Sequence, residues 1–104
     1  MSTQKFDHKN FKKEVMDCDR PVLVDVYADW CGPCRLLAPT IDEIAELTKD
    51  EKKVGKLNAD ENPELTKQFR INSVPTLLLF ENGKEKARLT GNQSKKRILE
   101  FLES

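Results

Sequence analysis

Residues 22–28 (Val-Leu-Val-Asp-Val-Tyr-Ala) form an almost unbroken run of β-branched and apolar side chains, interrupted by Asp25. Such a run predicts a central parallel strand that is buried on both faces. The sequence Trp-Cys-Gly-Pro-Cys follows at residues 30–34, and a helical repeat of apolar residues begins there. A buried strand that leads into a helix predicts an α/β fold, whose active sites lie beyond the carboxyl ends of the strands. The two cysteines fall at that position.

The remaining patterns extend this unit to the whole chain. Further strands are expected at residues 3–6, 53–58, 77–80 and 84–89, the last two joined by the hairpin sequence Asn82-Gly83. Helices are expected at about residues 8–17, 34–48, 63–69 and 94–102, with Asp7, Asn62 and Ser94 as caps. This order predicts a central mixed five-stranded sheet flanked by four helices, and one domain over residues 1–104.

Charge and length exclude several classes of function. The 104 residues carry 18 basic and 18 acidic side chains, so there is no basic excess to neutralise phosphates. We therefore expect no nucleic acid and no membrane surface as partners, and we expect a monomer. The chain begins without the apolar stretch of a signal peptide, and no later run is long enough to span a membrane. These features predict a cytoplasmic protein, in whose reducing surroundings the three cysteines do not indicate a disulfide framework.

Cys31 and Cys34 have the spacing that thiol–disulfide exchange needs. Side chains at positions i and i+3 of a helix lie about 5–6 Å apart, within reach of a disulfide. If Cys31 begins the helix, unpaired amide N–H groups and the helix dipole favour its thiolate over its thiol. We therefore predict that an exposed Cys31 attacks a target disulfide, and that a more buried Cys34 resolves the mixed disulfide. Gly32 would let a partner backbone approach, and Pro33 would favour a helix start.

Two other interpretations of this pair remain open. A structural disulfide that closes so short a loop would contribute only roughly 2 kcal/mol, and a reducing cytosol would tend to open it. A zinc site needs four ligands, and Cys18 and His8 could supply the missing two, although they lie on a separate predicted helix. Redox chemistry is favoured because the pair stands where a strand meets a helix. The redox group would then be the cysteine pair itself, with no bound cofactor or metal.

Asp25 is the second informative residue, because a carboxylate inside an apolar strand is costly unless it is neutral, paired or hydrogen-bonded. Burial favours its protonated form. Since the same strand delivers the cysteines, we predict that Asp25 acts as a general base toward Cys34. The alternative is a structural ion pair with a lysine on a neighbouring strand, such as Lys56.

The roles of one aromatic side chain and one cysteine are ambiguous from the sequence. Trp30 fits a binding-surface aromatic and a lid on the core equally well. Cys18 falls on the apolar stripe of its predicted helix, which favours packing as a small apolar group over a reactive thiol.

With these residues in hand, the sequence resembles the thioredoxin family over nearly all of the chain. The matching stretches are residues 24–25, 28–34, 56–58, 74–77 and 82–83, together with Gly91. The Trp-Cys-Gly-Pro-Cys run with a downstream Pro-Thr-Leu is highly specific, whereas a lone Cys-x-x-Cys would not be. The resemblance implies the thioredoxin fold and a general protein-disulfide reductase, since oxidases and isomerases of the superfamily usually carry a histidine between the cysteines.

The resemblance also implies roles that spacing does not show. Pro75 would be cis and packed against the cysteines, and the backbone of Val74 would pair with a substrate strand. Asp25 would be the buried proton acceptor, tuned by Lys56. A thioredoxin reductase would supply electrons, and disulfide-containing proteins would be the substrates. The apolar docking surface would consist of Trp30, Val74, Pro75 and Gly91.

Three residues depart from the family pattern. Tyr27 stands where tryptophan is frequent, Ser73 where a glycine often precedes Val-Pro, and Asn92 where a small apolar residue is common. Each touches the docking surface or its support, so the departures bear on partner choice and not on the redox chemistry. Two competing functions remain: a redox-independent binding module that uses the surface near Trp30, and a disulfide oxidase or isomerase.

Overall fold

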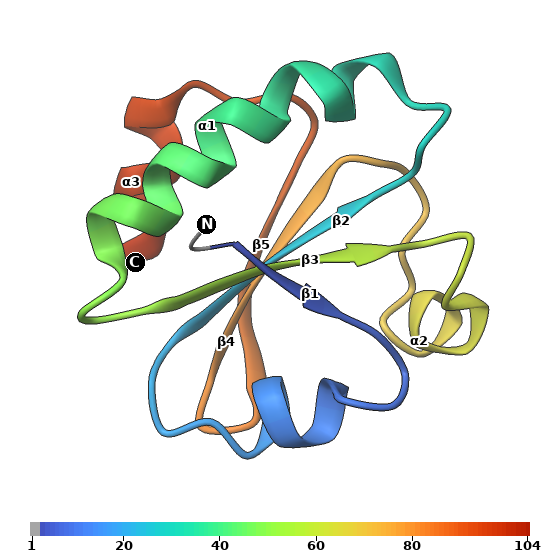
Figure 1. Cartoon of the computed structure of the whole chain (residues 1–104), viewed down its shortest axis with the longest axis horizontal. Helices are drawn as coiled ribbons and strands as arrows, with labels where there is room; N and C mark the ends of the chain where they lie inside the picture. Colours follow the sequence, from blue (N-terminus) through green and yellow to red (C-terminus); the bar gives the residue numbers. More distant parts are fainter. Residues whose placement is uncertain (1–2) are drawn as a thin grey trace.

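A computed structural model describes residues 3–104, and its centre is a mixed β-sheet (Figure 1). The strands lie side by side in the order β1 (Gln4–Phe6), β3 (Lys53–Asn58), β2 (Val22–Tyr27), β4 (Thr76–Glu81) and β5 (Lys84–Thr90). β1, β3 and β2 are parallel, β4 is antiparallel to β2, and β5 is antiparallel to β4. The predicted mixed sheet of five strands is therefore confirmed.

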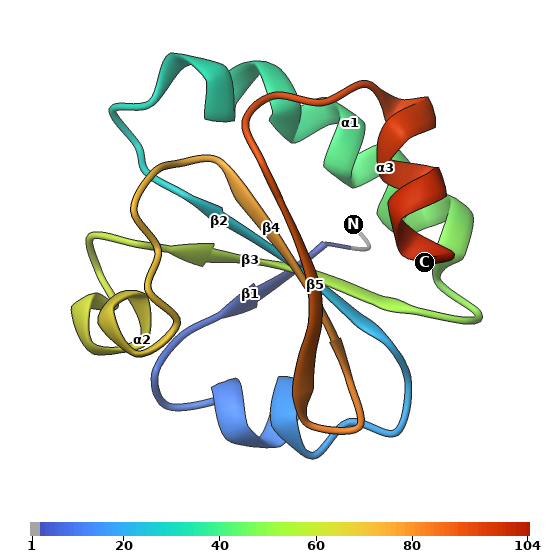
Figure 2. The same cartoon turned by 180° about the vertical axis from the view of Figure 1, so that it is seen from behind.

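Helices cover both faces of this sheet. α1 (Gly32–Thr48) and α3 (Lys95–Leu102) lie together on one face, where Glu43 and Lys95 form an ion pair between them. The π-helical segment η1 (Lys12–Met16) and α2 (Pro63–Gln68) lie on the opposite face (Figures 1 and 2). The α/β architecture with four helical segments within residues 3–104 agrees with the prediction.

β2 occupies the centre because it is apolar toward both faces. Leu23 packs in the cluster beneath α1 and α3, whereas Val24 and Val26 pack in the cluster beneath η1 and α2. Complete burial of a side chain of this size contributes about 1.5–3 kcal/mol relative to an exposed one. Because side chains alternate along a strand, Asp25 shares the face of Leu23 and points toward α1. The central strand thus carries one carboxyl group into the space under α1.

The segment after β1 differs from the predicted helix over residues 8–17. Residues 8–10 form a turn, and only Lys12–Met16 forms regular helical structure, of the π type. Asp7 caps this first turn as predicted: its Oδ1 accepts the N–H groups of Lys9 and Asn10 at 2.8 and 2.9 Å, and its carbonyl accepts the N–H of Phe11 at 2.9 Å. The Oδ1 of Asn10 accepts the N–H of Asp7 at 2.8 Å in return. This reciprocal pair of bonds is a capping box, which starts a helical turn directly after Asp7. The difference from the prediction is therefore the π-helical geometry of Lys12–Met16, where the N–H of Asp17 donates to the carbonyl of Lys12 at 2.8 Å.

The other turn predictions have mixed outcomes. Asn82 and Gly83 have φ of 53° and 79°, which is the pair of positive values that a tight two-residue hairpin between β4 and β5 requires. Ser94 caps α3 as predicted, because its Oγ accepts the N–H of Arg97 at 3.1 Å. Asn62 is the N-cap residue of α2 and Pro63 begins the helix, as predicted, but the Asn62 Oδ1 accepts the N–H of His8 and makes no capping bond to α2.

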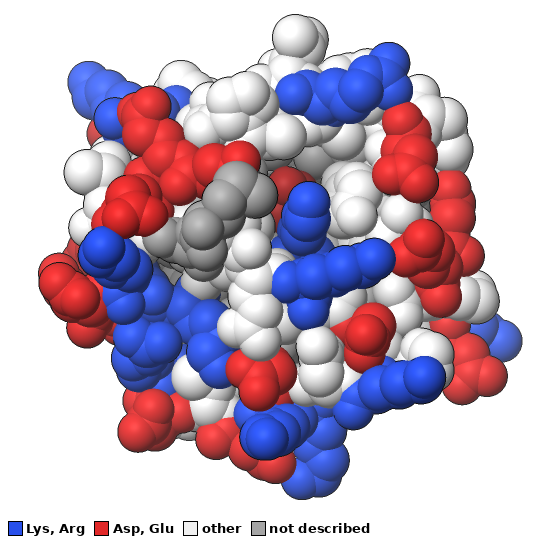
Figure 3. Space-filling model, in the orientation of Figure 1, with Lys and Arg blue, Asp and Glu red and all other residues white. Residues whose placement is uncertain are grey.

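The surface carries both signs of charge. Acidic and basic side chains are intermixed on the face shown in Figure 3, as expected from a chain with 18 of each. None of the helices within residues 3–104 combines the length and the apolar composition that a bilayer span requires.

Candidate active site

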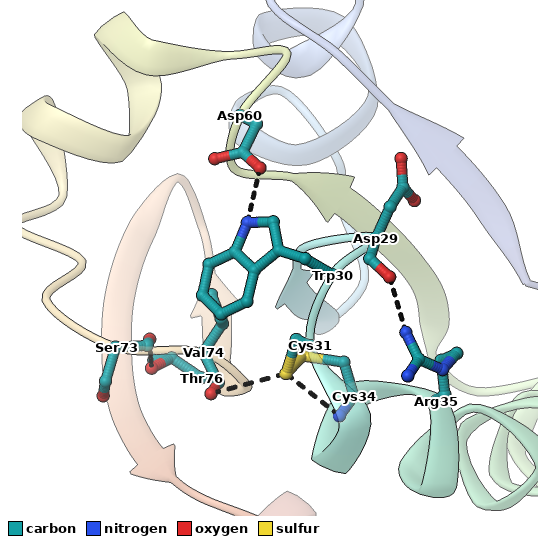
Figure 4. The surroundings of a disulfide bond; sticks show 9 residues. All are labelled: Asp29, Trp30, Cys31, Cys34, Arg35, Asp60, Ser73, Val74 and Thr76. Carbon is teal, nitrogen blue, oxygen red and sulfur yellow. Dashed lines mark hydrogen bonds between the residues drawn. A yellow bond between two sulfur atoms is a disulfide. The ribbon is translucent and has the colours of Figure 1, made fainter.

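Cys31 and Cys34 lie where β2 leads into α1, at the carboxyl end of the central strand (Figure 4). Cys31 is the N-cap residue of α1, and Gly32 and Pro33 begin its first turn. The two cysteines form a disulfide with their Cα atoms 5.3 Å apart. The Sγ of Cys31 also accepts the backbone N–H of Cys34 at 3.1 Å. In the reduced state this helix start can therefore stabilise a thiolate on Cys31.

The expectation that Cys31 is the more exposed cysteine is wrong for this oxidised state. Cys31 is 3% exposed and Cys34 is 5% exposed. The pair packs with Ala28, and Tyr27 and Val74 lie against it. The Sγ of Cys31 lies 3.7 Å from the carbonyl oxygen of Val74, so a neighbouring loop covers the sulfur.

That loop contains the peptide bond between Val74 and Pro75, which is cis as the family resemblance implied. The Oγ1 of Thr76 donates to the carbonyl of Ser73 at 2.7 Å, and the N–H of Gly91 donates to the carbonyl of Pro75 at 2.9 Å. These two bonds hold the loop on both sides of Val74. Its carbonyl group is thereby fixed beside the active-site sulfur.

Asp25 and Cys34 meet at a cavity between β2 and α1. Its volume is about 180 Å³, which has room for water beside the carboxyl group. Within residues 3–104 the buried Oδ1 of Asp25 has no hydrogen-bond partner. Burial raises the pKa of Asp25 to about 7, and the Lys56 ammonium opposes this rise. The residues that line the cavity are Asp25, Tyr27, Ala28, Asp29, Cys34, Arg35, Ala38 and Lys56.

Lys56 is the register partner of Asp25 on β3. Nevertheless, among the ion pairs within residues 3–104 there is none between the two side chains. The ammonium of Lys56 instead lies 5.7 Å from the centre of the Tyr27 ring, at the side of the cavity. The alternative of a structural ion pair is therefore wrong, and the cation acts on Asp25 only through space.

Trp30 lies on the surface next to the disulfide (Figure 4). It is 70% exposed, which contradicts a role as a lid on the core. Its Nε1 donates a hydrogen bond to Oδ2 of Asp60 at 2.8 Å, which fixes the ring direction. The sequence reasoning missed Asp60, although it follows the predicted strand at residues 53–58 and so lies at the same edge of the sheet as the cysteines.

A family model described as Thioredoxin matches residues 2–104. The chain belongs to the thioredoxin family. Thioredoxin of Rickettsia felis is 48% identical over 93 residues, which cover 89% of each chain. Thioredoxin 1 of a Nostoc species is 47% identical over 93 residues, covering 89% of this chain and 87% of the relative. Thioredoxin of Alicyclobacillus acidocaldarius is 47% identical over 97 residues, covering 93% of this chain and 91% of the relative.

Membership of the thioredoxin family confirms the predicted fold and makes the chain a thiol–disulfide oxidoreductase. The Cys31–Cys34 disulfide at the end of β2 is the redox group. A purely structural disulfide does not explain why this pair stands at a helix start beside a buried carboxyl group.

Cys18 lies away from this thioredoxin-family site. It is partly buried and packs against the cluster of Phe11 and Val15, as predicted for a small apolar group. The cysteine pair belongs to a different cluster, so the fold does not bring Cys18 and Cys31 together as ligands. In the part of the chain that the structure describes, no group of three or more His, Cys, Asp or Glu side chains is arranged to hold a metal ion.

The three departures from the thioredoxin pattern lie around the active site. Tyr27 lines the Asp25 cavity and contacts Lys56. Ser73 supplies the carbonyl that Thr76 holds, and Asn92 is an exposed residue directly after Gly91. All three positions support or border the surface around the disulfide.

Proposed function

We propose that this thioredoxin-family chain reduces disulfide bonds of other proteins, with Cys31 as nucleophile, Cys34 as resolving cysteine and Asp25 as proton acceptor. The observation that carries the proposal is the cavity that Asp25 shares with Cys34. A buried thiol is a weak nucleophile until it loses its proton, and a carboxyl group with a pKa of about 7 is suited to accept that proton near neutral pH.

In the first step, the thiolate of reduced Cys31 attacks one sulfur of the substrate disulfide. A bond forms between Cys31 and that sulfur while the disulfide of the substrate breaks, and the departing sulfur leaves as a thiolate. The N–H of Cys34, which lies 3.1 Å from the Sγ of Cys31 in the oxidised state, supports the negative charge on Cys31 before the attack.

In the second step, the Asp25 carboxylate accepts the proton of the Cys34 thiol. The Cys34 thiolate attacks the Sγ of Cys31, the mixed disulfide breaks, and the second substrate sulfur leaves as a thiolate. Two electrons have then passed from the dithiol to the substrate. The product on the protein is the Cys31–Cys34 disulfide, which is the state of this structure.

Substrate docking is assigned in this proposal to the surface of Trp30, Val74, Pro75 and Gly91. The exposed ring of Trp30 offers apolar contact area beside the disulfide. A substrate strand that pairs with the backbone of Val74 would bring its disulfide within reach of Cys31, because the Val74 carbonyl lies 3.7 Å from the Cys31 sulfur.

The proposal also covers the electron donor, the substrates and the cellular compartment of the redox cycle. A thioredoxin reductase would reduce the Cys31–Cys34 disulfide to the dithiol, and disulfide-containing substrate proteins would oxidise the dithiol again. The reaction runs in this direction in a reducing compartment, so the cytoplasm is the proposed location. The working unit is proposed to be a single-domain monomer.

Insulin reduction driven by dithiothreitol tests the reductase activity. The wild-type chain should accelerate precipitation of the insulin B chain, whereas Cys31→Ser and Cys34→Ser should lose multiple turnover. Activity that survives Cys31→Ser would overturn the mechanism. Insulin reduction by a variant that lacks both sulfurs would do the same.

The direction of electron flow needs a separate measurement. Equilibration with glutathione gives the reduction potential of the Cys31–Cys34 pair. A reductase requires a potential below that of glutathione, whereas a potential above it would indicate an oxidase.

A further inference from the structure

Arg88 on β5 makes an extensive set of hydrogen bonds outside the active site. Its Nη2 donates to the carbonyl of Phe69 at 2.7 Å, and its Nη1 donates to the carbonyl of Arg70 at 3.2 Å. Its Nε and Nη2 also donate to the two carboxylate oxygens of Glu85 at 2.7 and 2.8 Å. One guanidinium group thus joins an edge strand to the end of α2.

A bulge in β5 makes this arrangement feasible. Side chains three residues apart on a regular strand point to opposite faces, so Glu85 and Arg88 would normally diverge. The register shifts between Leu79 and Phe80, so that Glu85 pairs with Phe80 and Arg88 pairs with Leu78. Leu78 and Phe80 pack in the same cluster, and Glu85 and Arg88 therefore share the face of the sheet that carries α2.

The two carbonyls that Arg88 binds lie where α2 ends and the Val74 loop begins. Phe69 is the C-cap residue of α2, and Arg70 has φ of 53°, where the chain leaves the helix and enters the segment that leads to Val74. Carbonyls at a helix end lack helical partners, and a cation satisfies them well. The start of the loop is thus held by Arg88, while its far end is held by Gly91 on the Pro75 carbonyl.

We propose that Arg88 is a positioning residue for substrate docking, which fixes the 70–74 segment and so places Val74 beside Cys31. This inference rests on the proposed function, because it assigns the loop a docking role. Arg88 does not touch the reacting sulfurs, so it governs how a protein substrate binds and not the sulfur exchange itself. Loss of its bonds therefore raises KM for protein disulfides and spares small disulfides that need no docking surface.

The test compares Arg88→Gln and Arg88→Lys with Lys84→Gln, which removes an exposed β5 charge outside this network. Each variant is assayed with insulin and with bis(2-hydroxyethyl) disulfide, using dithiothreitol as reductant. For Arg88→Gln we expect KM for insulin to rise about five- to tenfold, while the rate with the small disulfide stays within about twofold. Arg88→Lys should fall between Arg88→Gln and the wild type, and Lys84→Gln should behave like the wild type.

An unchanged KM for insulin in folded Arg88→Gln would overturn the inference, and so would an equal loss with both disulfides. If Arg88→Gln does not fold, Glu85→Gln tests the same point. That variant weakens the hold on the guanidinium, and it should raise KM for insulin without slowing the small disulfide. Failure of the wild-type chain to reduce insulin would instead reject the proposed function, so the two failures are distinguishable.

Discussion

Asp25 and Cys34 line the same cavity, one from β2 and the other from α1. The strand that carries Asp25 also leads into the cysteine pair, so one stretch of chain positions both the carboxyl group that we propose as the base and the sulfur that it would serve. The carboxyl group is buried, and its pKa is raised to about 7 because burial disfavours the carboxylate. This combination is costly for folding and useful for proton transfer, and each consequence can be measured separately.

Replacement of Asp25 by Asn should slow resolution of the mixed disulfide. In the wild type this rate should rise as pH increases through about 7, since Asp25 becomes ionised and can accept the proton of Cys34. In Asp25→Asn the rise near pH 7 should be absent, so that the rate increases only at the higher pH where a thiol ionises without a base, and the rate at pH 7 should fall about 10- to 100-fold. Single-turnover kinetics of a preformed mixed disulfide across pH 5–9 provides the measurement. Asp29→Asn, an exposed carboxylate at the same cavity, is the control that should retain the wild-type profile.

The same substitution should stabilise the protein above neutral pH. In the wild type the unfolded chain ionises Asp25 from about pH 4 upward, whereas the folded chain keeps it protonated until about pH 7. Wild-type stability therefore declines over this window, and the loss is complete above it. The free energy of unfolding of Asp25→Asn relative to wild type should rise between pH 4 and 7 by about 1–4 kcal/mol and then level off. Urea titrations at several pH values test this. A difference in the free energy of unfolding that does not vary with pH would show that burial does not raise the pKa of Asp25.

Truncation of Trp30 should impair docking and leave the chemistry intact. Trp30→Ala removes the exposed aromatic ring beside the disulfide, so KM for insulin should rise about tenfold. The rate with bis(2-hydroxyethyl) disulfide should change by less than about twofold. Leu47→Ala, which truncates another exposed apolar side chain far along α1, is the matched control and should leave both substrates unaffected. An equal effect of the two truncations would remove Trp30 from the docking surface.

Close packing of β1 against β3 predicts a strict requirement for glycine at position 55. A Cβ there would clash with the ring of Phe6 and lie 2.8 Å from the carbonyl oxygen of Gln4. Gly55→Ala should therefore lower the free energy of unfolding by about 1–3 kcal/mol. At Gly32 a Cβ meets no atom within 4 Å, so Gly32→Ala should alter stability by less than about 0.5 kcal/mol. Urea denaturation of both variants decides the point, and equal stabilities would refute the packing argument.

The sequence predicted most of the helices and strands, because interactions between residues close in the chain determine where they form. The apolar run at residues 22–28 became the central strand, and Asn82-Gly83 became the hairpin turn. The cap at Asp7 was predicted correctly, because Asp7 and Asn10 accept each other's backbone N–H groups, but the expected α-helix is a turn followed by a π-helical segment. Apolar spacing is the same for a helix and for such a turn followed by one π-helical segment, so the pattern alone does not separate them.

Contacts between distant segments explain what the sequence did not predict at the site. Cys31 is buried because Val74, remote in the chain, folds over it. The bond from Trp30 to Asp60 and the bonds from Arg88 to the end of α2 also join segments that only the tertiary fold brings together. The placement of Asp25 was predictable, since it depends on alternation within one strand.

Trapping of the mixed disulfide tests the central claim most directly. Cys34→Ser keeps the attacking sulfur and removes the resolving one, so reduced Cys34→Ser should form a one-to-one covalent complex with a disulfide substrate. Intact-protein mass spectrometry should show this complex, peptide mapping should place the bond on Cys31, and dithiothreitol should release it. The control Cys31→Ser should form none. Absence of the complex with Cys34→Ser, or a bond that maps to Cys18, would contradict the assignment of Cys31 as nucleophile and Cys34 as resolving cysteine.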